Sequence, residues 1–308
     1  MRMKVTLVCA LIVSSCWAQI SINDSISYGA CIMRNGSIVG INENESFAMH
    51  SVMKFPQALY VADYLNRKGV ELDDTVVVDK AELMQDTWSP MLKQFGGVTA
   101  KRLQSEAAQV TAKRFHKAKR LKERAASRQE QARTDVKAFS YAELLRLSLG
   151  LSDNNACELL FKFCGKPQAV EGYMRKLGFH DIHVRMTEEQ MHKCPAKALE
   201  NSSTPADMVR LLEWFCHHKD DNPYLTFVWK AMADYSTGLK RIAAAIPADA
   251  RIVHKTGTGF PSPEGLQDMN DAGVVLMPDG GCAIIAVFTT HSPSEEVVAN
   301  IARQMLDY

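Results

Sequence analysis

The sequence predicts an α/β (α+β) protein with two lobes, one an antiparallel sheet with covering helices and the other all-helical. Runs rich in β-branched residues stand near both ends of the chain, and stretches with helical periodicity fill the middle. With 308 residues, 46% hydrophobic and 23% charged, the chain is long enough for one large or two interlocked domains. We expect the α/β lobe at 19–46 and 222–308, and the helical lobe at 47–221.

A β-hairpin is predicted near the N-terminal end of the chain. Two β-rich runs, 29–33 and 37–41, flank Asn35-Gly36, the strongest short hairpin signal. A helix is predicted next, because apolar residues recur at spacings of three and four from Val52 onward. Gly69 is expected to end this helix.

The remaining elements follow from the same signals. Residues 98–149 contain neither Gly nor Pro, which favours helix over most of that stretch. Ser140 and Glu143 form a capping-box pattern that begins a fresh helix, and Gly150 is expected to end it. The other expected elements are helices at 154–163, 168–177 and 206–215, strands at 75–78, 252–257, 272–277 and 282–290, an irregular segment at 187–205, and a last helix capped within 292–295.

Residues 1–18 have the pattern of a secretion signal. Arg2 and Lys4 precede the apolar run 5–13, which is too short to span a bilayer. Two kinds of processing compete: ordinary cleavage after Ala18, which we favour, and lipid attachment at Cys16 as in a bacterial lipoprotein. We therefore expect an exported, periplasmic protein.

A basic insertion is predicted at about 98–137. It carries 12 Lys and Arg against 4 Asp and Glu, although the whole chain has a net charge of only +1. Such a segment can contact anionic lipid or nucleic acid. Its apolar residues form no single clean stripe, and an exported protein rarely meets nucleic acid. We favour a solvent-exposed segment and expect no nucleic-acid partner. Weak contact of this segment with the cell envelope is the alternative.

Several metal-ligating residue types occur, but not in a recognised pattern. His192, Cys194, Cys216, His217 and His218 lack the spacings of a zinc finger. We therefore expect no metal and no other cofactor. The cysteines of the mature chain are scattered, which favours buried thiols over a disulfide framework.

Three short motifs carry the chemistry. They are Ser51-Val52-Met53-Lys54, Ser152-Asp153-Asn154 and Lys255-Thr256-Gly257, in that order. In the first motif the serine and the lysine lie one helical turn apart at a helix start, where unpaired N–H groups and the helix dipole favour negative charge. These are the conditions that an activated nucleophile needs. Each motif on its own can be explained by a purely structural role, as a helix start, a turn or a strand end.

In this order, and with Phe55-Pro56 and Trp88-Ser89-Pro90 beside them, the motifs resemble those of the class A serine β-lactamases. The resemblance is to the broad cephalosporinase branch found in Bacteroides-like bacteria. It covers nearly all of residues 29–308 apart from the basic insertion. We therefore expect a monomeric enzyme that acts on a small-molecule β-lactam.

The resemblance implies a catalytic role for four residues. Ser51 would be the acylated nucleophile, and Lys54 would assist its deprotonation. Ser152 would pass a proton to the β-lactam nitrogen. Glu188, which lies 36 residues after Ser152, would activate water for deacylation, although Glu189 beside it is the competing candidate.

The resemblance also implies a substrate-binding set. Asn154 would hold the substrate's amide group, and Trp88 would form one side of the cleft. The backbone N–H groups of Ser51 and Thr258 would form the oxyanion hole. The residues implied to bind substrate are Trp88, Asn154, Arg241, Lys255, Thr256, Gly257 and Thr258, of which Lys255, Thr256 and Arg241 would serve the carboxylate.

Two other functions stay open at the level of the sequence. A penicillin-binding D-Ala-D-Ala peptidase shares all three motifs but hydrolyses its acyl-enzyme slowly. A degenerate hydrolase scaffold that binds envelope lipid would explain the basic insertion. The glutamate at 188 and the compact length favour the β-lactamase.

Overall fold

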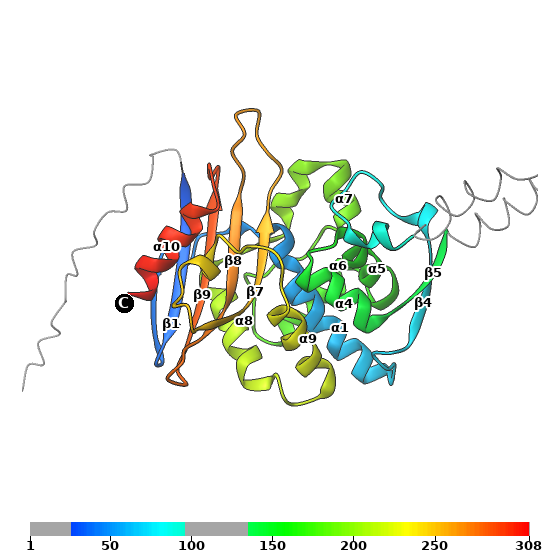
Figure 1. Ribbon diagram of the computed structural model, residues 1–308, viewed down its shortest axis with the longest axis horizontal. Helices are drawn as coiled ribbons and strands as arrows, with labels where there is room; N and C mark the ends of the chain where they lie inside the picture. Colours follow the sequence, from blue (N-terminus) through cyan, green and yellow to red (C-terminus); the bar gives the residue numbers. More distant parts are fainter. Residues whose placement is uncertain (1–25, 96–134, 308) are drawn as a thin grey trace, which may run out of the picture.

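The computed structural model describes residues 26–95 and 135–307, drawn in colour in Figure 1. The predicted signal segment, Cys16 and most of the basic insertion lie outside the described residues. The fold class is confirmed: a five-stranded antiparallel sheet with covering helices adjoins a group of helices. The order of the strands is β2-β1-β9-β8-β7.

The sheet joins the two ends of the chain. Its strands are β1 (Ser27–Arg34), β2 (Ser37–Ile41), β7 (Arg251–Thr258), β8 (Met269–Leu276) and β9 (Cys282–Thr290). The predicted hairpin is confirmed, because β1 pairs with β2 in antiparallel register through Asn35-Gly36, both of which have positive φ. On its other side β1 pairs with β9, so the hairpin extends the sheet formed by the C-terminal strands.

Helices cover both faces of this sheet. The helix α10 (Glu296–Leu306) contacts β1 and β9 from one side, and α8 (Pro205–His218) contacts the same strands from the other (Figure 1). Alternate residues of β1 consequently enter two separate apolar cores: Ala30 and Ile32 pack towards α10, whereas Cys31 and Met33 pack towards α8 and the helices beyond. Central strands that are covered on both faces have nearly continuous apolar sequences, and β8 and β9 are examples.

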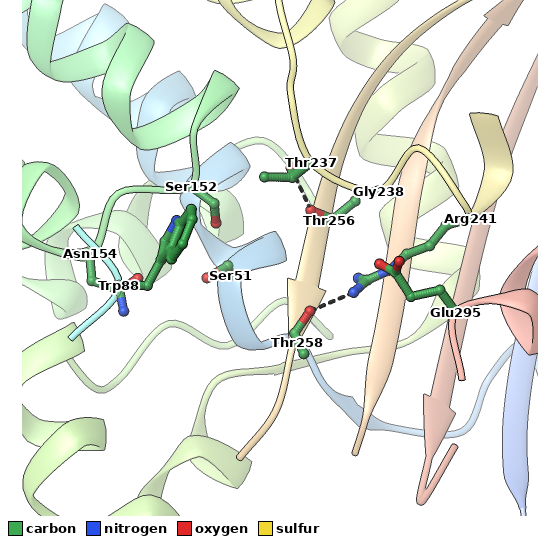
Figure 2. Close-up of a pocket in the computed structure, with 10 residues that line it drawn as sticks. All are labelled: Ser51, Trp88, Ser152, Asn154, Thr237, Gly238, Arg241, Thr256, Thr258 and Glu295. Atoms are coloured by element: carbon green, nitrogen blue, oxygen red, sulfur yellow. Dashed lines mark hydrogen bonds and ion pairs between the residues drawn. The ribbon is translucent and has the colours of Figure 1, made fainter. Parts of the chain in front are cut away.

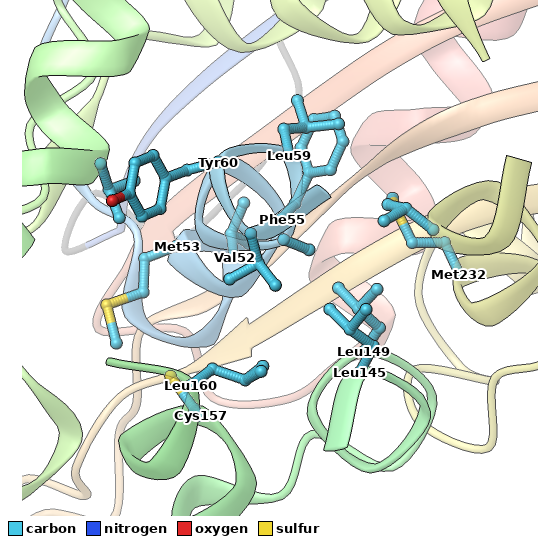
Figure 3. Close-up of a cluster of buried hydrophobic side chains, with 14 of the residues drawn as sticks. Val52, Met53, Phe55, Leu59, Tyr60, Leu145, Leu149, Cys157, Leu160 and Met232 are labelled. Carbon is cyan, nitrogen blue, oxygen red and sulfur yellow. The ribbon is translucent and has the colours of Figure 1, made fainter. Parts of the chain in front are cut away.

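The helix α1 (Lys54–Lys68) lies at the centre of the helical group. It contacts α4 (Tyr141–Gly150), α5 (Asn154–Cys164), α6 (Pro167–Lys176) and α9 (Pro223–Ala233). Figure 3 shows Phe55 and Leu59 of this helix among side chains from α4, α5 and α9. Because α1 is enclosed by other helices, ten of its fifteen residues are buried rather than one stripe. Its predicted end is confirmed, since Gly69 has φ 63 and caps the last turn.

Three predictions about local structure differ from the structure, and one helix was not predicted. Residues 136–140, expected to be helical, form β5 (Val136–Ser140), which pairs with β4 (Thr75–Asp79). The segment expected to be irregular contains α7 (Glu188–Lys193), begun by a Thr187 and Gln190 capping box. The helix α9 was not expected, although Asn222 and Pro223 are a typical start. The last helix begins at Glu296 with no side-chain cap.

Contacts run across the predicted division of the chain at residues 46 and 222. The helix α8 covers the sheet, while α9 contacts both α1 and β7. The lobe boundaries stay a prediction. Of the helices in the described ranges, none combines the length and the apolar character that crossing a bilayer requires.

Candidate active site

Ser51 lies at the junction between the sheet and the helical group. It belongs to the 3-10 turn η1 (His50–Met53), which runs directly into α1. The turn contacts β7 at Gly257, where an added Cβ would lie 2.3 Å from Met49 O and 3.2 Å from Ser51 N. Only glycine permits this approach of two backbones. The end of β7 is thereby held beside the backbone amide of Ser51.

Lys54 is fully buried in a polar cluster. Its Nζ lies 3.0 Å from Ser51 Oγ, 2.6 Å from Asn154 Oδ1 and 3.0 Å from Glu188 Oε1. A fourth contact, of 2.9 Å, joins it to the carbonyl oxygen of Ser152. A buried ammonium is stable only when it is paired and hydrogen-bonded, and these contacts provide both conditions. Lys54 therefore links the serine hydroxyl directly to a carboxylate.

Ser152 lies between two lysines. Its Oγ accepts a hydrogen bond from Lys255 Nζ at 3.0 Å and lies 3.5 Å from Lys54 Nζ. Its backbone has φ +55, an uncommon conformation for a non-glycine residue that is frequent at functional sites. Burial, followed by the positive charges of Lys54 and Arg241, holds the pKa of Lys255 well below the usual value of a lysine.

The two adjacent glutamates have different surroundings. Glu188 is 7% exposed and points into the site, whereas Glu189 pairs with Lys193 at the surface at 2.7 Å. The backbone N–H of Glu189 donates to the carboxylate of Glu158 in α5, at 3.0 Å. The short helix α7 is thereby docked on the helical group with Glu188 facing Lys54.

Arg241 is buried at the opposite end of the site. Its NH1 donates to the carbonyl oxygens of Gly257 and Asn270, both at 2.8 Å. Its NH2 donates to Thr258 Oγ1 at 2.5 Å, and its Nε donates to Glu295 Oε1 at 2.9 Å. The guanidinium is therefore fixed beside the end of β7 by four hydrogen bonds.

These groups surround a cavity of about 400 Å³ (Figure 2). It is lined by Ser51, Trp88, Ser152, Asn154, Thr237, Gly238, Arg241, Thr256, Thr258 and Glu295. A second cavity of about 400 Å³ adjoins it at Ser51 and extends past Glu188 towards Phe260. Trp88 lines both cavities; the residue is 61% exposed, and its Nε1 donates to Leu151 O at 2.9 Å.

The structure brings the predicted site residues to one place. Seven of them line the first cavity, Lys54, Lys255 and Gly257 contact residues that do, and Glu188 contacts Lys54 and lines the second cavity. Among the predicted metal-ligating types, His192 lies 3.2 Å from Asp86 across the mouth of the second cavity. Within residues 26–95 and 135–307 no three His, Cys, Asp or Glu side chains form a group suited to a metal.

Sequence reasoning missed several residues of this site. Glu295 pairs with Arg241 across 54 positions of the chain, a distance at which no local pattern signals a contact. His50, which has φ +48, places its Nε2 2.9 Å from Asp268. Although burial raises it, the hydrogen bond and charge of His50 bring the pKa of Asp268 below its usual value. The sequence signal that could have identified His50 as a site residue is its position directly before the predicted nucleophile.

The chain matches a known protein family over most of its length. The family described as Beta-lactamase enzyme family (Beta-lactamase2) matches residues 18–110 and 105–308. A β-lactamase of Bacteroides uniformis is 27% identical over 88% of this chain and 82% of its own length. The extended-spectrum β-lactamase PER-1 of Pseudomonas aeruginosa is 27% identical over 85% of this chain and 75% of its own.

Among solved structures, a class A β-lactamase of Bacteroides cellulosilyticus is similar in fold. It superposes with a TM-score of 0.71 at 26% identity, and the match covers 92% of each chain. The family match extends over far more than half of the sequence, and the matched residues include all three motifs. The chain therefore belongs to the beta-lactamase enzyme family, as a class A serine β-lactamase.

Proposed function

We propose that this β-lactam hydrolase opens the ring through an ester formed on Ser51. Its substrate carries a strained amide, and an oxygen nucleophile must lose a proton as it attacks the carbonyl carbon. The Lys54 amine, 3.0 Å from Ser51 Oγ, is within reach of that proton, and the Glu188 carboxylate, 3.0 Å from Lys54 Nζ, stabilises the ammonium that forms. The C–N bond of the lactam breaks as the ester forms.

The departing nitrogen needs a proton, for which Ser152 is the candidate. Its hydroxyl lies 3.0 Å from Lys255 Nζ and 3.5 Å from Lys54 Nζ, so a proton given to the lactam nitrogen is replaceable from either lysine. The amides of Ser51 and Thr258 would hold the carbonyl oxygen while it carries negative charge. Their proximity follows from the close contact of Gly257 with the turn that carries Ser51.

The substrate's carboxylate would bind at the far end of the first cavity. Lys255 and Arg241 provide positive charge there, and Thr256 and Thr258 provide hydroxyl groups. Asn154 would hold the amide group on the other side of the ring, near the wall formed by Trp88. Charge-assisted hydrogen bonds of this kind orient an anionic substrate as well as binding it.

Deacylation would use Glu188. A carboxylate that lies beside both Lys54 and the second cavity is placed to take a proton from water that attacks the ester. The products would be the ring-opened acid and the regenerated Ser51 hydroxyl. The observation that carries the proposal is Lys54 in hydrogen-bonding distance of the serine and of a buried carboxylate at once.

The direct test is turnover of a chromogenic cephalosporin by the mature enzyme. Ser51→Ala should abolish it, because the change removes the hydroxyl that lies 3.0 Å from Lys54 Nζ and that would form the ester. Turnover that survives this change would contradict the proposal. Slow release of a long-lived adduct, together with cleavage of a D-Ala-D-Ala peptide, would instead favour the penicillin-binding peptidase.

Three finer points belong to the same proposal. We infer that cephalosporins are substrates, supported by the space of the second cavity on one side of Ser51 and by the extended-spectrum name of the relative PER-1. We also propose export to the periplasm with cleavage after Ala18 rather than lipid attachment at Cys16. The enzyme would act as a monomer. Intact mass of the protein from a periplasmic extract tests the processing, and light scattering tests the oligomeric state.

A further inference from the structure

One wall of the first cavity has neither helix nor strand structure over most of its length. This wall segment, residues 235–242, brings Thr237, Gly238 and Arg241 to the cavity (Figure 2). A segment without regular backbone hydrogen bonding needs other contacts to keep one position. The contacts it makes with the sheet therefore decide how precisely Arg241 is placed.

The sheet meets this segment with three buried side chains. Thr256 of β7 pairs directly with Asp271 of β8, and His254 lies two residues earlier on the same face of β7. All three are at most 5% exposed. Lys255, between the two residues of β7, points to the other face, where it meets Ser152. One strand thus serves the catalytic cluster on one face and the wall segment on the other.

The wall segment fits closely over this face. The ring of Tyr235 stands edge-on to His254 with 4.2 Å between the centroids, and Thr237 Oγ1 lies 3.0 Å from Thr256 Oγ1. Gly238 has φ +75, and a Cβ there would lie 2.3 Å from Thr256 Cγ2. A side chain at 238 would therefore lift the segment from the sheet.

Asp271 makes the connection nearest to Arg241. Its Oδ2 accepts the backbone N–H of Ile242, the next residue in the chain, at 3.1 Å. Its Oδ1 lies 2.7 Å from His254 Nδ1. His254 Nε2 is buried and has no hydrogen-bond partner among the described residues, so a proton on Nδ1 alone leaves no buried N–H unpaired. Asp271 is then the charged member, and it bridges the wall segment and β7.

We propose that Asp271 is a positioning residue of the substrate-carboxylate site: through its bonds to Ile242 and His254 it holds the backbone beside Arg241 against β7 and so helps to fix the distance between Arg241 and Lys255. The inference rests on the proposed function, because it takes Arg241 and Lys255 as the two cations that bind the carboxylate. Charge-assisted hydrogen bonds between a guanidinium and a carboxylate depend on geometry, so a displaced Arg241 binds the carboxylate less well. Substrate binding is therefore expected to depend on Asp271 even though its side chain does not reach the cavity.

The test separates KM from kcat for a cephalosporin with a free carboxylate and for its methyl ester. Asp271→Ala should raise KM for the free acid about 10-fold, since hydrogen bonds to charged groups are worth at least that factor. Its kcat should stay within about threefold, because uniform binding rather than chemistry is lost. KM for the ester should not change. Asp271→Asn, whose amide oxygen can still accept from Ile242 but whose NH2 then faces the Nδ1–H of His254, should raise KM less than Asp271→Ala.

Two controls isolate the effect. Asp207 is also a buried aspartate, whose Oδ2 accepts the N–H of Asp181 at 2.8 Å and whose Oδ1 pairs with Arg210, but it lies in α8 away from the cavity. Asp207→Ala should lower the melting temperature and leave KM unchanged. In an Arg241→Ala background, Asp271→Ala should add less than about threefold to KM, because the two residues act through one contact with substrate.

The outcomes distinguish this inference from the proposed function. If Arg241→Ala raises KM and Asp271→Ala does not, the positioning role is wrong while the carboxylate site stands. If Arg241→Ala leaves KM unchanged, the proposed carboxylate site fails and the inference with it. Should Asp271→Ala not fold, His254→Phe keeps the ring beside Tyr235 but removes the Nδ1 donor. His254→Phe should raise KM for the free acid, whereas His254→Asn should keep KM near the wild-type value. Equal KM values in the two variants would overturn the inference.

Discussion

At the scale of single residues, the site is a set of buried charges that hold one another in place. Lys54 and Lys255 are both almost completely buried, and the Ser152 hydroxyl lies within 3.5 Å of each. Two neighbouring cations of this kind are tolerated because Glu188 pairs with the first at 3.0 Å. The electrostatic cost falls on Lys255, whose pKa is lowered by burial and by Lys54 and Arg241.

This lowered pKa predicts the alkaline limit of activity. Lys255 should lose its proton, and with it the attraction for a substrate carboxylate, at a pH below the ~10.4 of an ordinary lysine. We expect kcat/KM for a carboxylate substrate to fall as pH rises through that value, and the fall to be absent in Lys255→Arg, whose guanidinium stays charged. If kcat/KM falls at the same alkaline pH in the wild-type enzyme and in Lys255→Arg, the assignment of this limit to Lys255 is wrong.

The same group has an opposite effect on stability. The unfolded chain binds this proton up to pH ~10.4, whereas the folded chain releases it earlier, so in that window the unfolded state binds more protons. The contribution of Lys255 to the free energy of unfolding therefore rises with pH while its contribution to binding falls. The two effects are separable by measuring melting temperature and KM over the same range.

At the scale of elements, the decisive contact joins β7 to the turn η1. The strand approaches so closely at Gly257 that a methyl group there would meet the carbonyl oxygen of Met49 at 2.3 Å. Backbone atoms on both sides cannot move without shifting Ser51 or Thr258. The proposed oxyanion hole would therefore be set by the docking of two elements rather than by any one side chain.

Gly257→Ala tests this contact. It should lower kcat at least about 100-fold, the factor typical of a lost oxyanion donor, because the two amides would be forced apart. Gly172 in α6 is the matched control, since a Cβ there meets no atom within 4 Å. Gly172→Ala should leave kcat unchanged and raise stability by up to about 1 kcal/mol. Steady-state kinetics and thermal unfolding of both variants are the measurements, and an active Gly257→Ala enzyme would refute the docking argument.

The elements also show what the sequence was able to predict. Local signals were sufficient for the β1–β2 hairpin, for the capping box at Ser140 and for Gly69 at the end of α1. The strand β5 was missed because its partner β4 lies about 60 residues earlier, and pairing rather than local propensity fixes it. Helix α7 was missed because six residues are too few for a periodic signal.

The site divides in the same way. Ser51 and Lys54 are one turn apart, and the other motifs stand at ends of elements, so their chemistry was visible in the sequence. The partners of these residues were not. His50 and Asp268 are 218 positions apart, and Asp271 lies 17 positions from His254 on another strand. Such contacts depend on how strands and loops meet, and they give no local pattern.

At the scale of the whole molecule, the basic insertion joins two places that already lie together. Lys137 Nζ donates to Gln94 Oε1 at 2.6 Å, and the rings of Phe95 and Phe139 are 5.7 Å apart. The chain therefore leaves and re-enters the described structure at neighbouring points. In Figure 1 both points lie on the β4–β5 side of the helical group, on the other side of it from the five-stranded sheet, and neither Phe95 nor Lys137 lines either cavity that contains Ser51.

Replacing residues 98–134 with a short Gly/Ser link should consequently leave hydrolysis nearly unchanged, with kcat/KM within about threefold of the full chain, because loop closure costs little when the ends are close. Sedimentation with anionic vesicles at low and high salt tests the remaining role of the segment. Binding that disappears on replacement identifies an envelope arm. A large loss of kcat/KM would show that the insertion supports the site.

The proposed hydrolysis depends on Glu188 as the base for deacylation. Glu188→Gln keeps the shape of the side chain but cannot take a proton, so deacylation should slow by about 10²–10⁴-fold while Ser51 keeps Lys54 beside it. Glu189→Gln is the matched control, because that side chain pairs with Lys193 at the surface.

The most direct measurement is the intact mass of both variants after mixing with a penicillin. A covalent penicilloyl adduct should accumulate on Glu188→Gln and be absent from Glu189→Gln. An adduct that accumulates on Glu189→Gln instead would identify Glu189 as the base. No adduct on either variant would contradict hydrolysis of an acyl-enzyme by this carboxylate.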